Sequence, residues 1–348
     1  YFYETYQGFL YSRIVYDNVK KLGEVGKPIK NFVNDMSSEF KDHKVFEMYD
    51  EYPDYLKEAW KAILKELINS YSRNSLIGLG LMKIDFNDDV RMQGNTKFNL
   101  TEKEVRDICL VLISQMLEDN AIHHGQNFTE ADIAFYSNNG SEGSYVLTNP
   151  QNKYTKSFLP KSDHTINKRY DYIERIFKEK GLDCDRIVIQ KFLRSIWEKM
   201  FENNGLLIDT KDFNGKRVNI GKFKVVNTDE WHRCPKCHRI TSYNVNGICP
   251  AYKCEGKLQK IDVKSLVENN HYYRIYNELD VQPLRVVEHT AQLSNEEAYN
   301  LQEKFKRQEI DVLSCSTTFE MGVDVGDLET VFLRDVPPLP SNYAQRAG

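Results

Sequence analysis

The sequence predicts an α/β protein in which a long, mainly helical region precedes a small four-cysteine module and a parallel strand–helix–strand unit. Apolar residues recur at helical spacing through the first third of the chain, and four of the seven cysteines lie within residues 234–254. Near the C-terminal end, two short apolar runs flank a capped helical segment. The 348 residues carry a formal net charge of −4 and are 41% hydrophobic, which excludes a disordered or fibrous chain.

The N-terminal region is predicted to be helical. Residues 2–25 and 58–71 have apolar side chains at helical spacing, whereas residues 76–86 form an apolar run that predicts a strand. Thr101 and Glu104 have the spacing of a capping box, so we expect a buried amphipathic helix to begin there.

The middle of the chain predicts two helices, at residues 170–180 and 186–203, followed by a hairpin. Its strands would be residues 206–208 and 218–226, with a turn around Asn214 and Gly215. Helix, helix and hairpin in this order resemble a winged helix, whose second helix and wing commonly contact nucleic acid. Residues 151–260 hold 23 Lys/Arg against 13 Asp/Glu. These cations either contact phosphate or only keep helix faces and a strand edge solvated.

The four clustered cysteines, Cys234, Cys237, Cys249 and Cys254, have the spacing C-x2-C-x11-C-x4-C. Two such pairs can close a tetrahedral Zn²⁺ site with no open position for water, so we predict structural zinc. The alternative is four unconnected buried thiols. Thiolate ligands point to a reducing compartment, and no apolar run is long enough to span a bilayer. We therefore expect a cytoplasmic protein that is not embedded in a membrane.

The most informative motifs lie after the cysteines. Strands are predicted at residues 284–288, 310–315 and 331–333, the second of them buried, and Ser294 with Glu297 caps the helix between the first two. Residues 312–326 read VLSCSTTFEMGVDVG, which places hydroxyl groups directly after the second strand, at the sheet edge where open α/β folds bind ligands.

These residues resemble conserved helicase motifs. The segment from Ser316 to Asp324 resembles motif V of superfamily 2 helicases, and residues 343–348 (YAQRAG) resemble the opening of motif VI. Residues 335–338 resemble the segment after the penultimate strand of the same domain. Residues 288–293 (EHTAQL) resemble a stretch of large bacterial DExH-box helicases that carry a four-cysteine zinc module and are related to Lhr-type enzymes. The resemblance is close over residues 231–348 and looser before them.

The resemblance implies a partial RecA-like parallel sheet domain. Residues 261–348 would be the C-terminal part of the second RecA-like domain, and residues 231–260 the zinc module. Residues 1–100 would be a helical insertion and residues 101–230 a helical and winged-helix-like one. The chain would then be a fragment whose partner is the first RecA-like domain of the same longer chain. It contains no Walker A or Walker B sequence and none of the later motif VI arginines. We expect no ATPase activity from it alone.

The resemblance also implies site residues for an ATP-dependent helicase that uses ATP and Mg²⁺. Gly322, Asp324, Gln345 and Arg346 would face the nucleotide, with Asp324 on the ribose. The residues expected to contact the nucleic-acid strand are Thr290, Gln292, Ser316, Thr317 and Thr318. DNA with 3′ to 5′ movement is the expected substrate, with RNA not excluded, and no catalytic residue is assigned within the chain.

A second interpretation needs no missing sequence. The chain would be a non-catalytic nucleic-acid-binding module, in which a winged helix and a zinc ribbon bind and the α/β unit is a scaffold. It accounts for the basic middle segment and the absent Walker motifs. It leaves unexplained why the motif V-like and motif VI-like residues occur together.

Overall fold

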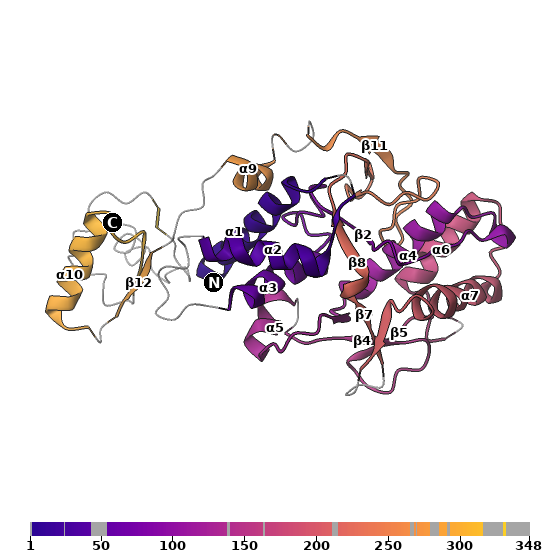
Figure 1. The fold of residues 1–348 in the computed structure, drawn as a ribbon, viewed down its shortest axis with the longest axis horizontal. Coiled ribbons are helices and arrows are strands. Elements are labelled where there is room, and N and C mark those ends of the chain that lie inside the picture. Colours follow the sequence, from indigo (N-terminus) through magenta and orange to yellow (C-terminus); the bar gives the residue numbers. More distant parts are fainter. Residues whose placement is uncertain are drawn as a thin grey trace, which may run out of the picture. The chain divides into compact units, whose positions relative to one another are not determined.

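The computed structural model describes residues 2–23, 25–42, 54–137, 140–162, 164–210, 215–264, 268, 270–278, 285–290, 293–315 and 330–331. The chain divides into two compact units. One consists of residues 4–43 and 49–280; the other consists of residues 281–348 with two short N-terminal segments. Both contain helices and strands, which confirms the α/β class (Figure 1). No helix among the described residues has the length and apolarity needed to cross a membrane.

Three helices open the larger unit: α1 (Phe2–Lys20), α2 (Ile29–Asp42) and α3 (Tyr55–Ile68). Helix α3 packs against α2 and against the short helix α5 (Glu130–Tyr136). Helix α1 is bound to α3 by side-chain hydrogen bonds, because Tyr11 and Ser12 donate to the buried carboxylates of Glu58 and Glu66. Buried polar groups paired in this way fix how the helices pack.

The strand predicted at residues 76–86 is shorter in the structure. Strand β2 covers only Lys83–Phe86, and the preceding apolar residues form buried turns. The buried carboxylate of Glu66 accepts the N–H of Leu76 at 2.7 Å, and Gly80 has φ = +77°, which an extended strand does not allow. The apolar run belongs to the hydrophobic core, but its backbone hydrogen bonds join residues close together in the sequence.

Most residues of helix α4 (Glu102–Leu117) are buried. Its predicted capping box is confirmed, because Thr101 and Glu104 exchange both hydrogen bonds. It packs against α3 and against α6 (Lys168–Glu179). The next helix, α7 (Arg186–Ser195), continues as the π-helix η3 (Ile196–Glu202). Short 3₁₀ turns occur at η2 (Thr96–Phe98) and η4 (Ile220–Lys222).

Two sheets complete the body of the larger unit. One has the antiparallel order β1-β8-β2. The other has the order β3-β7-β4-β5, with β6 also paired to β7. Their remaining strands are β1 (Lys27–Pro28), β3 (Ile122–His123), β4 (Ser144–Val146), β5 (Thr155–Ser157), β6 (Leu207–Asp209), β7 (Lys216–Asn219) and β8 (Phe223–Val226).

The hairpin expected after α7 forms in part. Strands β6 and β7 pair antiparallel, as predicted, but β7 also pairs with β3 and β4. The single strand expected at residues 218–226 is divided by η4, so β8 belongs to the other sheet. Strand β7 is therefore an interior strand of a mixed sheet.

The cysteine module has a small antiparallel sheet with the order β10-β9-β11. Its strands are β9 (Trp231–Arg233), β10 (Ile240–Thr241) and β11 (Gln259–Ile261). Trp231, Ile240 and Val263 form a core on which Leu81 packs. Helix α9 (His271–Glu278) follows and packs on α1, where the rings of Phe9 and Tyr272 stack with centroids 5.8 Å apart.

In the smaller unit, the described residues form the predicted strand–helix–strand unit. Strands β12 (Val286–His289) and β13 (Val312–Cys315) are parallel, and α10 (Asn295–Lys306) connects them. The predicted capping box of Ser294 and Glu297 is confirmed. The prediction that β13 is buried is wrong for the described residues, because only β12 pairs with it and its side chains are partly or fully exposed. The third strand was predicted at residues 331–333, and only its first residue is described.

Candidate functional site

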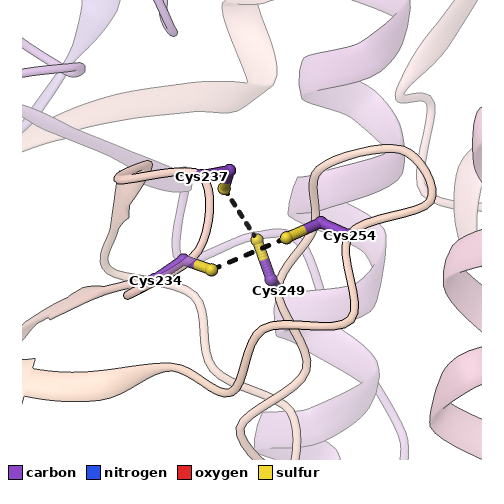
Figure 2. A group of neighbouring side chains, drawn as sticks. All are labelled: Cys234, Cys237, Cys249 and Cys254. Carbon is purple, nitrogen blue, oxygen red and sulfur yellow. Dashed lines mark hydrogen bonds between the residues drawn. The ribbon is translucent and has the colours of Figure 1, made fainter.

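The four predicted zinc ligands come from two loops of the small antiparallel sheet. In the first loop, the N–H of Cys234 donates to the carbonyl oxygen of Arg239 at 2.9 Å. The N–H of His238 donates to the carbonyl oxygen of Cys234, also at 2.9 Å, so the chain reverses around the thiols. His238 has φ = +61°, a left-handed conformation that this tight turn requires. The second loop closes where the N–H of Cys254 donates to Ala251 at 3.1 Å. All four side chains point toward one centre (Figure 2).

The sulfur positions fit a tetrahedral metal site. The four Sγ atoms lie within 4.8 Å of one another, and the Cys234–Cys254 and Cys237–Cys249 distances are 3.6 and 3.5 Å. Zn–S bonds of about 2.3 Å in a tetrahedron place the sulfurs about 3.8 Å apart. The structure thus brings the four residues together, and the alternative of four unconnected thiols does not hold.

The thiol chemistry also favours a cation at this centre. Burial opposes ionisation of Cys234, but the N–H groups of Cys237 and Lys236 donate to its sulfur and lower its pKa to about 7. Burial raises the pKa of both Cys237 and Cys249. Four adjacent thiols therefore cannot all ionise alone, whereas a divalent cation stabilises the four thiolates together.

The backbone lies against one side of the cluster. A Cβ atom on Gly256 would lie 2.3 Å from the Cys234 sulfur and 3.2 Å from the Cβ of Lys236, so the backbone lies directly against a ligand. His232 and His238 flank the first loop but are not among the clustered ligand atoms. Four sulfurs complete a tetrahedron, so the chemistry that these residues support is structural metal binding.

Most cations near the module already have partners. Lys236 pairs with Glu255 at 3.1 Å, Lys257 pairs with Glu179 of α6, and Arg239 lies 3.6 Å from the centre of the Tyr71 ring. A phosphate group would have to compete with these contacts. The geometry therefore favours a module that braces the larger unit.

Three described lysines of the expected wing are also paired. Lys216 contacts Asp209 at 2.8 Å, and the pairs Lys222–Asp89 and Lys224–Asp88 measure 2.5 and 2.7 Å. These contacts support the interpretation in which the cations solvate and tie strands rather than bind phosphate.

The parallel strands place one predicted site residue, Thr290, at an edge of their sheet. The register pairs His289 with Cys315, so both strands end together and Thr290 lies at that edge. The His289 ring is buried, and its Nε2 lies 3.4 Å from the Gln302 amide of α10, which holds the end of β12. The other predicted nucleotide-facing and strand-contacting residues lie outside the described part of the chain: Gln292, Ser316, Thr317, Thr318, Gly322, Asp324, Gln345 and Arg346.

The C-terminal part of the chain is similar to a known helicase domain. Residues 258–348 match the family described as the helicase conserved C-terminal domain, and the match begins one residue before β11. No solved structure matches significantly.

Three relatives share a short segment with this chain, and two of them carry a helicase name. The chain is 46% identical over 79 residues to Druantia protein DruE of Escherichia coli (strain UMEA 4076-1), covering 19% of this chain and 4% of that protein. It is 39% identical over 64 residues to the ATP-dependent helicase Lhr-Core of Methanocaldococcus jannaschii, covering 18% and 8%. It is 29% identical over 79 residues to the probable ATP-dependent RNA helicase ddx51 of Dictyostelium discoideum, covering 23% and 14%. The chain thus spans a small part of each relative, and the matches support a helicase-family segment.

Proposed function

We propose that the chain is part of an ATP-dependent helicase or translocase of superfamily 2, of the Lhr-like type with a zinc module. The observation that carries the proposal is the helicase C-terminal match over residues 258–348. The parallel strand–helix–strand unit agrees with it, because a doubly wound sheet is built from such units. Residues 261–348 would form the C-terminal part of the second RecA-like domain.

The preceding regions would be insertions in that domain. Residues 1–100 are proposed as a helical insertion, residues 101–230 as a helical and winged-helix-like insertion, and residues 231–260 as the structural zinc module. The helix–helix–strand order after Lys168 supports the second assignment, although β7 also pairs within a larger sheet. The cysteine geometry supports the third.

The residues proposed to act on the nucleotide are Gly322, Asp324, Gln345 and Arg346. Asp324 would accept hydrogen bonds from the ribose, and Gln345 and Arg346 would lie near the phosphates. ATP with Mg²⁺ would supply the free energy for movement, and the first RecA-like domain of a longer chain would supply the phosphate-binding and hydrolytic groups. This chain alone is expected to have no ATPase activity.

The residues proposed to contact the nucleic-acid strand are Thr290, Gln292, Ser316, Thr317 and Thr318. The register of β12 and β13 bears on Thr290 alone, which follows β12 where both strands end. DNA is the proposed substrate, and the protein would move along it in the 3′ to 5′ direction. The proposed location is the cytoplasm. RNA stays open, since one relative carries the name of an RNA helicase.

The non-catalytic binding module has less support from the described residues. It depends on free cations on the winged-helix and zinc surfaces, and Lys216, Lys222, Lys224, Lys236 and Lys257 are all paired with carboxylates.

The test is an ATPase assay on the longer chain encoded by the gene, with and without single-stranded DNA. We expect DNA-stimulated hydrolysis, and a fall in kcat/KM of about 10- to 150-fold in Arg346→Ala, because a charge-assisted hydrogen bond contributes about 1.5–3 kcal/mol. Lys97→Ala, a change at an exposed lysine far along the sequence, is the matched control. Unchanged hydrolysis in Arg346→Ala would refute the assigned role, and an inactive longer chain would refute the helicase proposal.

A further inference from the structure

Arg175 of α6 makes an unusual set of contacts with the second cysteine loop. One terminal nitrogen of its guanidinium donates to the carbonyl oxygens of Cys249 and Cys254, both at 2.7 Å. The other donates to the carbonyl of Ala251 at 2.9 Å. Three carbonyls of one loop, two of them belonging to predicted metal ligands, therefore converge on one side chain.

The remaining donors of Arg175 bind Asp171, one turn earlier on α6. The contacts to the Asp171 carboxylate measure 3.2 Å from Nε and 2.8 Å from the terminal nitrogen. Five hydrogen bonds thus match the five N–H groups of a guanidinium. The same carboxylate oxygen accepts the N–H of Lys253 at 3.0 Å, so Asp171 holds the loop as well as Arg175.

This pair is largely shielded from water, with 15% of the Arg175 side chain and 10% of the Asp171 side chain exposed. Arg175 and Asp171 together carry no net charge, so the pair acts on the cluster through its hydrogen bonds to the loop. In the structure the three carbonyls share one guanidinium while the loop is closed around the thiols. Contacts of this kind orient metal ligands without touching the metal.

We infer that Arg175, oriented by Asp171, is a positioning residue for zinc: it holds the Cys249–Cys254 loop in its metal-binding conformation and couples the metal to helix α6. The inference rests on the proposed zinc site. The inference gives the cysteine module a specific partner on α6, a side chain that lies 59 positions before Cys234. Lysine cannot replace it, because an ammonium has three donors and no planar fork.

The experiment measures zinc affinity in the full chain by competition with a chromophoric chelator under reducing conditions. The variants are Arg175→Lys, Arg175→Met and Asp171→Asn. The control is Lys257→Met, because the Lys257–Glu179 pair joins the same module to the same helix but is about half exposed. Thermal melting at saturating Zn²⁺ reports folding, and the Co²⁺ absorption spectrum reports whether all four thiolates still bind.

We expect both Arg175 variants to weaken zinc binding by about 10- to 100-fold, with the four-thiolate Co²⁺ spectrum retained at saturation. Asp171→Asn keeps an acceptor for Lys253 but loses the charge that orients Arg175, so a loss of at least about threefold is expected. Lys257→Met should stay within about twofold of the unchanged chain.

Arg175 variants that fold and bind zinc within about threefold of the unchanged chain would overturn the inference. If they fail to fold even with saturating zinc, Asp171→Asn decides, and an unchanged affinity in that variant would also overturn it. An unchanged chain that takes up no zinc would overturn the metal site itself, which distinguishes that failure from a failure of the Arg175 inference alone.

Discussion

Asp107 of α4 lies at the contact between the body of the larger unit and the cysteine module, where its carboxylate accepts the N–H of Asn244 at 3.2 Å. The residue is only 4% exposed. Burial raises its pKa to about 6, despite this hydrogen bond and the charges of Lys83 and Lys103, which act in the opposite direction. Asp107 therefore stays protonated in the folded chain at pH values where the unfolded chain has released the proton.

The sign of the effect on stability follows from this difference. Between the unfolded pKa of 3.8 and the folded pKa of about 6, the folded state binds more protons, so the free energy of unfolding falls as pH rises. The full loss is about 3 kcal/mol, at 1.36 kcal/mol per pKa unit. About half of it develops between pH 5 and pH 8.

Asp107→Asn removes the titration and keeps an oxygen that can accept the Asn244 N–H. We expect the variant to be more stable than the unchanged chain at pH 8, with an advantage that shrinks by about 1.5 kcal/mol when both are measured at pH 5. Urea unfolding at matched pH measures it, and any acid-induced loss of zinc affects both chains alike. An advantage that is independent of pH, or a variant less stable at pH 8, would refute the reasoning.

Two further predictions concern the cysteine cluster. Cys237→Ser removes one of four ligands, so the zinc content should fall well below one per chain and the module should become protease-sensitive. Unchanged metal content by plasma emission spectroscopy, together with an unchanged melting curve, would contradict a structural role. Gly256→Ala inserts a methyl group against the Cys234 sulfur, so we expect the free energy of unfolding to fall by about 1–3 kcal/mol. Urea titration with zinc present measures it. Unchanged stability would show that the loop can accommodate the methyl group.

Local sequence signals predicted the elements whose stabilising contacts are local. The capping boxes at Thr101 and Ser294 marked the starts of α4 and α10, because both hydrogen bonds lie within four residues. The cysteine spacing predicted the cluster for the same reason, since each pair of ligands lies within one loop.

Contacts between distant segments could not be predicted in this way. The apolar run after residue 76 has the composition of a strand, but the buried carboxylate of Glu66 takes its first N–H and the run becomes turns. Strands β4 and β5 have three residues each, too few for an alternating pattern. The Asp171–Arg175 pair has ordinary i, i+4 spacing on a helix, so nothing in the sequence connected it to the cysteines.

The coding sequence on both sides of residues 1–348 tests the helicase proposal most directly. The proposal predicts a Walker A sequence and a D-E-x-H or D-E-x-D sequence upstream, and the remaining arginines of motif VI directly after Gly348. A gene with neither the upstream phosphate-binding sequences nor the downstream arginines would contradict the proposal.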